Sequence, residues 1–325
     1  MNIQHFIKKV NRLATNRIPF LFIIDFEATS PQVYTLEEAE DNGYFYDIKG
    51  QTNYQLQYDE SLSDFQFDSH PISFHHYQKA FEIVHNHIAK GNTYLLNLTF
   101  PSEIITNLTL EAIFKMTTAK YKLYAKDRFV IFSPECFVKI KDGHIYSYPM
   151  KGTIDSQIPN AKQLLLQNQK ELWEHNTIVD LIRNDLAMVS DDVEVSKFRY
   201  IDKIKTHKGE LLQVSSEIKG RLPEGWKRHL GELLLTLLPA GSISGAPKQK
   251  TVEIIKSVEV DERNYYTGIF GVFDGESLDS AVNIRFLEQT PAQKYFYRSG
   301  GGITFWSKLE EEYQELINKI YVPTF

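Results

Sequence analysis

A lysine near the end of a predicted strand is the first residue in this sequence whose type and position could do chemistry. Residues 143–148 are rich in β-branched and aromatic side chains and predict a strand, and Gly152 is expected to end it directly after Lys151. A lysine at a strand end is held in place, as a side chain with a chemical role must be. The same pattern is also typical of a solvated turn lysine. Other motifs in the sequence are needed to distinguish a site lysine from a turn lysine.

Two pairs of glutamates form the second pattern with chemical potential. Glu171 and Glu174 are three residues apart on a long helical pattern and therefore share one face of the predicted helix. Glu312 and Glu315 repeat this spacing on the last predicted helix, and Lys319 follows on the same face. Carboxylate pairs suit a hard divalent cation such as Mg²⁺, which binds oxygen ligands. The ordinary alternative for each pair is a solvated acidic face.

Two further patterns resemble sites without fitting them. Four histidines lie on or near a helix predicted over 74–89, but His85 and His87 are two residues apart and point to different faces, which disfavours zinc. In Gly241–Lys248 only three residues separate the two glycines, which excludes a phosphate loop. This segment instead predicts a tight loop that opens a helix over Lys248–Val258, whose first N–H groups could hold a carboxylate.

The elements that must position these residues are mainly strands. Strands are predicted near 18–26, 43–46, 93–100, 129–132, 143–151, 193–200, 211–218, 268–273, 280–287 and 295–298, and helices near 74–89, 110–119, 160–188 and 248–258. A last helix is expected to begin with Ser307 as its N-cap and Glu310 completing a capping box. Strands occur in hairpin-like pairs with helices between groups of them, which favours an α+β fold with mainly antiparallel sheets.

A polar stretch before Pro71 predicts a boundary between a short amino-terminal, strand-rich segment, residues 1–70, and a main domain, residues 71–325, on which it packs. The formal charge of the 325 residues is −6, and no dense Lys/Arg run is present, which argues against a nucleic-acid partner. No apolar run approaches the roughly 20 residues that cross a membrane. The single cysteine, Cys136, excludes an internal disulfide and suits a reducing compartment, so a cytoplasmic location is expected.

Six motifs occur in a fixed order between Phe74 and Ile320, about three quarters of the chain. They are Ser133-Pro134-Glu135, Pro149-Met150-Lys151-Gly152-Thr153, Glu171-Leu172-Trp173-Glu174-His175 with Arg183-Asn184-Asp185-Leu186, Gly241 to Lys248, Asn283-Ile284-Arg285, and Gly300-Gly301-Gly302-Ile303 with Glu312 to Glu315. Together they resemble the chorismate-utilising enzymes, which include anthranilate synthase component I, aminodeoxychorismate synthase component I, and the isochorismate and salicylate synthases. The resemblance implies one large α+β domain, with central mainly antiparallel sheets flanked by helices and a chorismate-binding active site in a cleft.

The roles that the resemblance implies fall on the residues that match the family's motifs. Glu174 and Glu315 are expected to bind Mg²⁺, with Glu171 and Glu312 supporting the metal and substrate. Substrate contacts are implied for Arg285, Lys319, the Ser244 hydroxyl and the backbone of Gly301 and Gly302. Glu135 is expected to be the general acid, and Lys151 the nucleophile of a covalent intermediate. Such a nucleophile must be neutral, so the site is expected to lower the Lys151 pKa through burial, Mg²⁺ or Arg285.

Two departures from the family pattern bear on the reaction. Leu95 stands where the isochorismate and salicylate synthases have a lysine base, which disfavours water addition, and Gln213 stands where the family has a histidine associated with pyruvate elimination. The leading interpretation is therefore the aminodeoxychorismate synthase component I branch, which makes 4-amino-4-deoxychorismate for folate and para-aminobenzoate synthesis. Ammonia is expected from a separate glutamine amidotransferase subunit. Anthranilate synthase component I and a non-catalytic chorismate-binding subunit are the alternatives.

Overall fold

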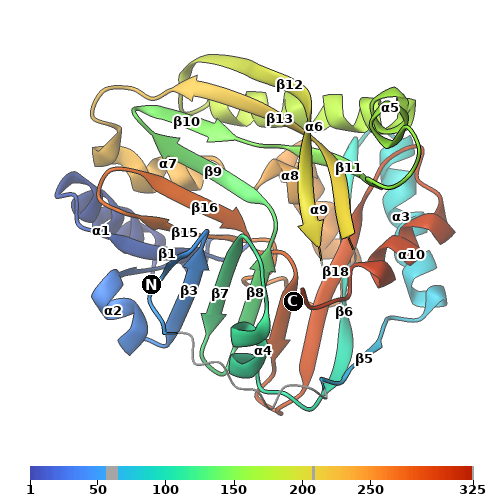
Figure 1. The fold of residues 1–325 in the computed structure, drawn as a ribbon, viewed down its shortest axis with the longest axis horizontal. Helices are drawn as coiled ribbons and strands as arrows, with labels where there is room; N and C mark the ends of the chain where they lie inside the picture. Colours follow the sequence, from blue (N-terminus) through green and yellow to red (C-terminus); the bar gives the residue numbers. More distant parts are fainter. Residues whose placement is uncertain (56–64, 207–208, 324–325) are drawn as a thin grey trace.

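The computed structural model describes residues 1–55, 65–206 and 209–323 (Figure 1). Two nine-stranded sheets make up most of the molecule, and every strand pairing in these ranges is antiparallel, which confirms the predicted α+β class. No helix in the described ranges is long and apolar enough to cross a membrane.

The first sheet has the order β11-β13-β10-β9-β16-β15-β1-β2, and β12 also pairs with β13. Its strands are β1 (Phe20–Ile24), β2 (Gln32–Thr35), β9 (Cys136–Lys141), β10 (His144–Ser147), β11 (Met150–Asp155), β12 (Asp191–Thr206), β13 (Gly209–Arg221), β15 (Ile269–Phe273) and β16 (Leu278–Val282). β1 and β15 are apolar and buried along their whole lengths, as expected of strands in the centre of a covered sheet.

The second sheet has the order β14-β6-β18-β17-β8-β7-β3-β4, and β5 pairs with β6. Its strands are β3 (Tyr44–Ile48), β4 (Gln51–Thr52), β5 (Phe67–His70), β6 (Leu95–Thr106), β7 (Tyr121–Ala125), β8 (Phe129–Ser133), β14 (Gly245–Ala246), β17 (Phe286–Gln289) and β18 (Tyr295–Ile303). β9 follows β8 after two residues in the other sheet, so the chain passes between the sheets at Pro134 and Glu135.

Helices cover the outer parts of both sheets (Figure 1). They are α1 (Ile3–Thr15), α2 (Leu36–Asp41), α3 (Phe74–Ala89), α4 (Leu110–Met116), α5 (Ala161–Gln167), α6 (Gln169–Ala187), α7 (Leu230–Thr236), α8 (Gly241–Ser244), α9 (Lys248–Val258) and α10 (Leu309–Asn318), with a 3-10 turn, η2, at Trp226–His229. The predicted bounds of α3 and α9 are confirmed. α3 begins where the Ser73 side chain accepts a hydrogen bond from the backbone N–H of His76.

Two predicted elements differ in the structure. The helix predicted over 160–188 is two helices, because Asn168 leaves the helical region (φ −64°, ψ 111°) and caps α6 by accepting from the Glu171 N–H. Lys151 lies inside β11 rather than at a strand end: the β11–β13 pairing shifts register between Met150 and Thr153, and Gly152 takes φ +81° there.

The capping box predicted at Ser307 is wrong. Lys308 is the N-cap residue of α10 and makes no side-chain cap, whereas the Ser307 hydroxyl donates to the Glu312 carboxylate at 2.7 Å and accepts from the Thr304 N–H. The serine therefore holds a glutamate of the second acidic pair instead of the first turn of the helix.

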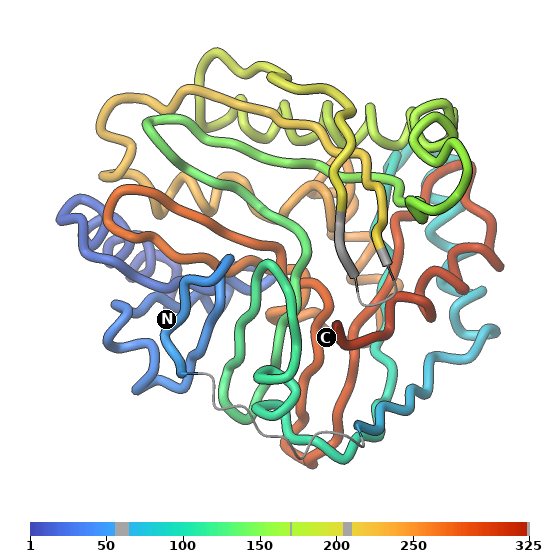
Figure 2. Tube along the Cα trace, in the orientation of Figure 1, coloured from blue at the N-terminus to red at the C-terminus, as the bar shows by residue number. Residues whose placement is uncertain are grey.

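The first 70 residues contribute strands to both sheets. β1 pairs along its length with β15, near the other end of the chain, whereas β3 pairs with β7 and β5 with β6. Figure 2 shows the trace of α1 and β1 running beside that of β15 and β16. A division of the chain at residue 70 stays a prediction, since the paired strands on its amino-terminal side belong to the same sheets as the rest.

Candidate active site

A cavity of about 390 Å³ opens between the two sheets where α6, α8 and α10 meet them. It brings together predicted site residues that are far apart in sequence, namely Glu135, Lys151, Glu174, Arg285, Gly302, Glu315 and Lys319. These residues come from β11, β18, α6, α10 and the loops beside β9 and β17. The cavity therefore combines acidic, basic and backbone groups, the convergent polar groups that mark a small-molecule site.

Lys151 is ion-paired in this cavity. Its Nζ lies 2.9 Å from Oε2 of Glu174. Burial by itself lowers the pKa of Lys151, but the carboxylates of Glu174, Glu315 and Glu171 raise it, and the net pKa is above the ordinary lysine value. The expectation that the site lowers this pKa is wrong for the protein without ligands, because three acidic side chains from two helices favour the ammonium form.

Glu135 is the acid of the cavity. It lies between β8 and β9, and its Oε1 accepts a hydrogen bond from the Ser242 hydroxyl at 2.8 Å. Burial raises the pKa of Glu135, while Ser242 and the positive charges of Arg285, Lys319 and Lys151 act in the opposite direction without cancelling the rise. A carboxyl group that stays protonated to higher pH suits the role of a general acid.

The serine that reaches the cavity is Ser242. Ser244 is fully buried, and its hydroxyl donates to the carbonyl oxygen of Ala240 at 2.8 Å, so the structure does not place it against a substrate. Both serines belong to the single helical turn α8, where residues two apart point in different directions. A helical turn predicted at this loop would have indicated that only one of the two serines can face the cavity.

Glycines allow the acidic side chains to approach the strands. A Cβ atom on Gly301 would lie 3.2 Å from both Oε2 of Glu312 and Oε1 of Glu315, and one on Gly152 would lie 3.0 Å from Oε2 of Glu171. Gly302 lines the cavity, and the missing side chain of Gly301 leaves room for the carboxylates of α10. A backbone contact of Gly301 with the substrate stays a prediction.

The carboxylates fit a divalent cation in donor type. Glu174 and Glu315 line the cavity, each bonded to a lysine: Glu174 to Lys151, and Glu315 to Lys319 at 2.5 Å. Oxygen donors of this kind are those that Mg²⁺ accepts. In residues 1–55, 65–206 and 209–323, no three His, Cys, Asp or Glu side chains are already arranged as a metal site, including the histidines of α3. The lysines contact one oxygen of each carboxylate, Oε2 of Glu174 and Oε1 of Glu315, so Mg²⁺ would share these carboxylates with the ammonium groups or displace them.

Arg285 and Lys319 add positive charge to the cavity lining. Arg285 lines the cavity at a positive φ of 55°, and its Nε is buried with no hydrogen-bond partner within the described part of the chain. Lys319 donates to the carbonyl oxygen of Gly300 at 2.8 Å, and burial lowers its pKa. A buried donor without a partner costs free energy unless a ligand accepts from it, which is consistent with carboxylate binding by Arg285.

The two positions that separate branches of the family differ in location. Leu95 lines the cavity, and its Cδ1 lies 3.0 Å from the position of a Cβ on Gly302, so an apolar group occupies this wall. Gln213 lies on β13 opposite Thr153 and is not among the cavity-lining residues that the structure describes.

Exposed aromatic side chains at the cavity are a feature that sequence reasoning missed. Tyr94, Trp173, Phe305 and Trp306 all line it, yet Trp173 is 70% and Trp306 76% exposed. The position of Trp173 near the site could have been inferred, because it is next to Glu174 on the same helix. Phe305 and Trp306 lie in a loop after β18, where no periodic pattern of residues indicates their position. Large exposed apolar side chains around one opening commonly mark a surface that contacts a ligand or another protein.

Comparison with known proteins decides the family. The sequence matches the family described as chorismate binding enzyme over residues 20–324. The chain belongs to this family. A PabA-like protein of Pasteurella multocida (strain Pm70) is 56% identical over 323 residues, which cover 99% of each chain.

Relatives with more specific names represent two branches of this chorismate-binding family. The aminodeoxychorismate synthase component 1 of Salmonella typhimurium is 36% identical over 58% of this chain and 42% of its own length. The crystal structure of anthranilate synthase component I from Streptococcus pneumoniae TIGR4 has a TM-score of 0.69 and is 27% identical, covering 81% of this chain and 60% of the other. These similarities support an enzyme of this family with the predicted fold. They do not distinguish between the two products, so the product has to be argued from the residues of the cavity.

Proposed function

We propose that this protein is an enzyme of the aminodeoxychorismate synthase component I type, which converts chorismate and ammonia to 4-amino-4-deoxychorismate for para-aminobenzoate and folate synthesis. The observation that carries the proposal is that Lys151 and Glu135 line the same cavity, since a lysine nucleophile and a general acid are the two groups that a covalent route needs. The apolar Leu95 on the same wall cannot serve as a water-activating base.

The cavity residues divide the work as follows. Arg285 and Lys319 bind the substrate carboxylates, which fixes the ring between Lys151 and Glu135. Lys151, once it has lost its proton to solvent, attacks C2 while the ring double bonds shift and the C4 hydroxyl leaves as water with the proton of Glu135. Ammonia then attacks C4, the double bonds shift back, and the Lys151 nitrogen, protonated in the adduct, leaves C2 as the neutral amine. The new C4 ammonium returns a proton to Glu135. Two allylic displacements therefore place nitrogen at C4.

A magnesium ion, held by Glu174 and Glu315 with Glu171 and Glu312 behind them, would supply positive charge for a substrate carboxylate. Glu174 would have two roles, because it is a proposed metal ligand and also the ion-pair partner whose carboxylate raises the pKa of Lys151. The acidic side chains of α6 and α10 would then serve both the metal and the lysine.

Product analysis tests the proposed reaction directly. Purified protein is incubated with chorismate, Mg²⁺ and an ammonium salt, and the products are separated by chromatography. We expect 4-amino-4-deoxychorismate. Anthranilate with pyruvate would instead assign the chain to the anthranilate branch, and binding of chorismate without any turnover would indicate a non-catalytic subunit.

Removal of the metal is expected to stop turnover. Excess EDTA should abolish product formation, and Glu174→Gln or Glu315→Gln should each raise the Mg²⁺ concentration for half-maximal rate at least about tenfold, because a charged ligand is lost. The matched control is Glu310→Gln, an exposed residue of α10, which should leave that concentration unchanged. Full activity in excess EDTA would contradict the metal assignment.

The isolated chain is expected to use ammonium and not glutamine. The only thiol, Cys136, is a partly buried residue at the start of β9, and burial raises its pKa to about 12, so very little thiolate forms near neutral pH. Product formation should be restored from glutamine only when a glutamine amidotransferase is added. Glutamine-dependent product from the purified chain alone would show that this chain generates its own ammonia.

A further inference from the structure

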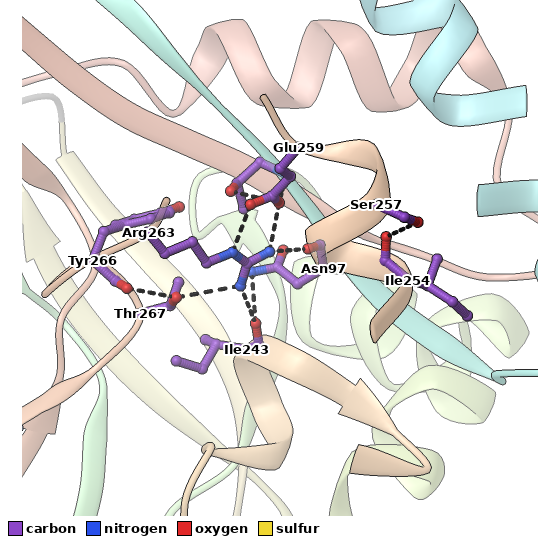
Figure 3. Close-up of polar contacts among 9 residues, drawn as sticks. Asn97, Ile243, Ile254, Ser257, Glu259, Arg263, Tyr266 and Thr267 are labelled. Carbon is purple, nitrogen blue, oxygen red and sulfur yellow. Dashed lines mark hydrogen bonds and ion pairs between the residues drawn. The ribbon is translucent and has the colours of Figure 1, made fainter. Parts of the chain in front are cut away.

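A buried ion pair lies behind the cavity wall (Figure 3). Arg263 and Glu259 form a two-pronged contact, Nε to Oε2 at 2.8 Å and Nη2 to Oε1 at 2.6 Å, and their side chains are only 1% and 6% exposed. Removing two charges from water is costly, and apolar residues of similar size often replace such a pair without loss of stability. The pair therefore calls for a role beyond stability, which its other hydrogen bonds indicate.

Most of the remaining hydrogen bonds of the pair join two elements of the cavity wall, and one further bond runs from Arg263 Nη1 to the Thr267 hydroxyl at 3.2 Å. Arg263 donates through Nη1 to the carbonyl oxygen of Ile243 in α8 at 3.3 Å, and through Nη2 to that of Asn97 in β6 at 2.5 Å. The Asn97 side chain also donates to the Ile243 carbonyl at 3.1 Å, and Glu259 accepts from the N–H and hydroxyl of Thr99. Figure 3 shows the guanidinium at the centre of these contacts.

The segment that Arg263 holds carries the hydrogen-bond donor to the proposed acid. Ile243 and Asn97 line the cavity, and Ser242, the residue before Ile243, donates to Glu135 at 2.8 Å. α8 is only one helical turn and makes no side-chain cap, so its own hydrogen bonds fix it weakly. The bonds from Arg263 and Asn97 are the side-chain contacts to the Ile243 carbonyl in the described structure.

We infer that Arg263, paired with Glu259, is a positioning residue that fixes α8 so that Ser242 keeps Glu135 in place for proton donation. The inference rests on the proposed role of Glu135 but not on which amino product is formed. It assigns a task to a buried charge pair that contacts neither the cavity nor a substrate.

A variant that removes both charges tests this role without leaving one of them unpaired. Arg263→Met combined with Glu259→Gln deletes the Arg263 bonds to Ile243, Asn97 and Thr267, and the glutamine oxygen can still accept from Thr99. We expect kcat for chorismate consumption to fall about tenfold, the scale of one lost hydrogen bond, with KM changed less than about twofold. Ser242→Ala should have a similar effect, and the triple variant should be no slower than the Met/Gln pair, because both changes break the same connection.

Lys122→Met provides a matched control. Lys122 is also a buried cation, 3% exposed, but its bonds go to the Thr117 carbonyl and Tyr54 hydroxyl, away from the cavity. We expect it to lower the Tm without lowering kcat. Two outcomes would overturn the inference. One is a loss of kcat in the triple variant equal to the product of the losses in Ser242→Ala and in the Met/Gln variant. The other is a loss of kcat in Lys122→Met similar to that of the Met/Gln variant when the two have the same Tm.

A crystal structure of the Met/Gln variant gives a readout that needs no turnover. Loss of the 2.8 Å contact between Ser242 and Glu135 would support the inference, and its retention would contradict it. Consumption of chorismate to any amino product suffices for the kinetics. A failure of the proposed 4-amino reaction would therefore appear in the product analysis and not in this comparison.

Discussion

Replacement of Lys151 by alanine is expected to abolish the covalent adduct with chorismate and to reduce the rate of 4-amino product by about 10³-fold or more, the scale on which enzymes lose activity without their covalent nucleophile. Lys151 lines the cavity and carries the only amine on β11, so no neighbouring residue of that strand can replace it. The vacated space would admit ammonia near C2, and part of the remaining turnover is expected to shift toward amination there.

Mass spectrometry of the intact protein with chorismate, in the absence of ammonium, measures the adduct, and chromatography measures the products. Lys151→Arg is the matched control, because it keeps a positive charge beside Glu174 but has no nucleophilic amine. Both variants should lack the adduct. If the native protein forms no adduct and Lys151→Ala keeps its rate and product, Lys151 is a structural residue of the strand and the covalent route is excluded.

Glu135→Gln is expected to lower kcat about 10²- to 10⁴-fold, the usual contribution of a general acid. The amide is almost the same size and can still accept the hydrogen bond from Ser242, so the loss would report the missing proton and not a changed shape. Chorismate binding should be retained, since Arg285 and Lys319 remain in the cavity lining.

The activity is also expected to depend on pH in a direction that the pKa of Glu135 sets. Because burial raises the pKa of Glu135, the protonated acid persists above the ordinary glutamate range, and activity that needs it is lost as pH rises through the raised value. The charged groups that face it are Arg285, Lys319 and Lys151, which oppose this rise. In Glu135→Gln this alkaline loss should disappear, leaving a low rate that no longer depends on the acid.

Thermal unfolding is the control for Glu135→Gln. A buried carboxyl group with a raised pKa favours folding only while it is neutral, and this contribution is lost as pH rises through the folded-state pKa. A permanently neutral glutamine removes the cost of burying the charge, so the Tm near neutral pH should be unchanged or higher. A lower Tm together with lost activity would mean that the substitution damages packing rather than acid catalysis.

Sequence alone was sufficient for the fold class and for most of the site. The α+β class followed from the alternation of apolar residues and turn signals, because such periodicity is a local property of each strand. The bounds of α3 and α9 followed for the same reason, because helical spacing and a tight loop at a helix start act within a few residues. The cavity also contains Lys151, Glu135 and both predicted metal ligands, as the motif resemblance implied.

Tertiary structure decided the properties that depend on residues from different elements. The Lys151 pKa is raised because α6 and α10 bring Glu171, Glu174 and Glu315 to one strand, and no local pattern specifies that meeting. The choice of Ser242 over Ser244 depends on which side of a single helical turn faces Glu135. The pair of Arg263 and Glu259 has the spacing of an ordinary surface ion pair, and only the packing of β6 and α8 around it turns it into a buried support of the active site, because burial and shared hydrogen bonds arise from contacts across the fold.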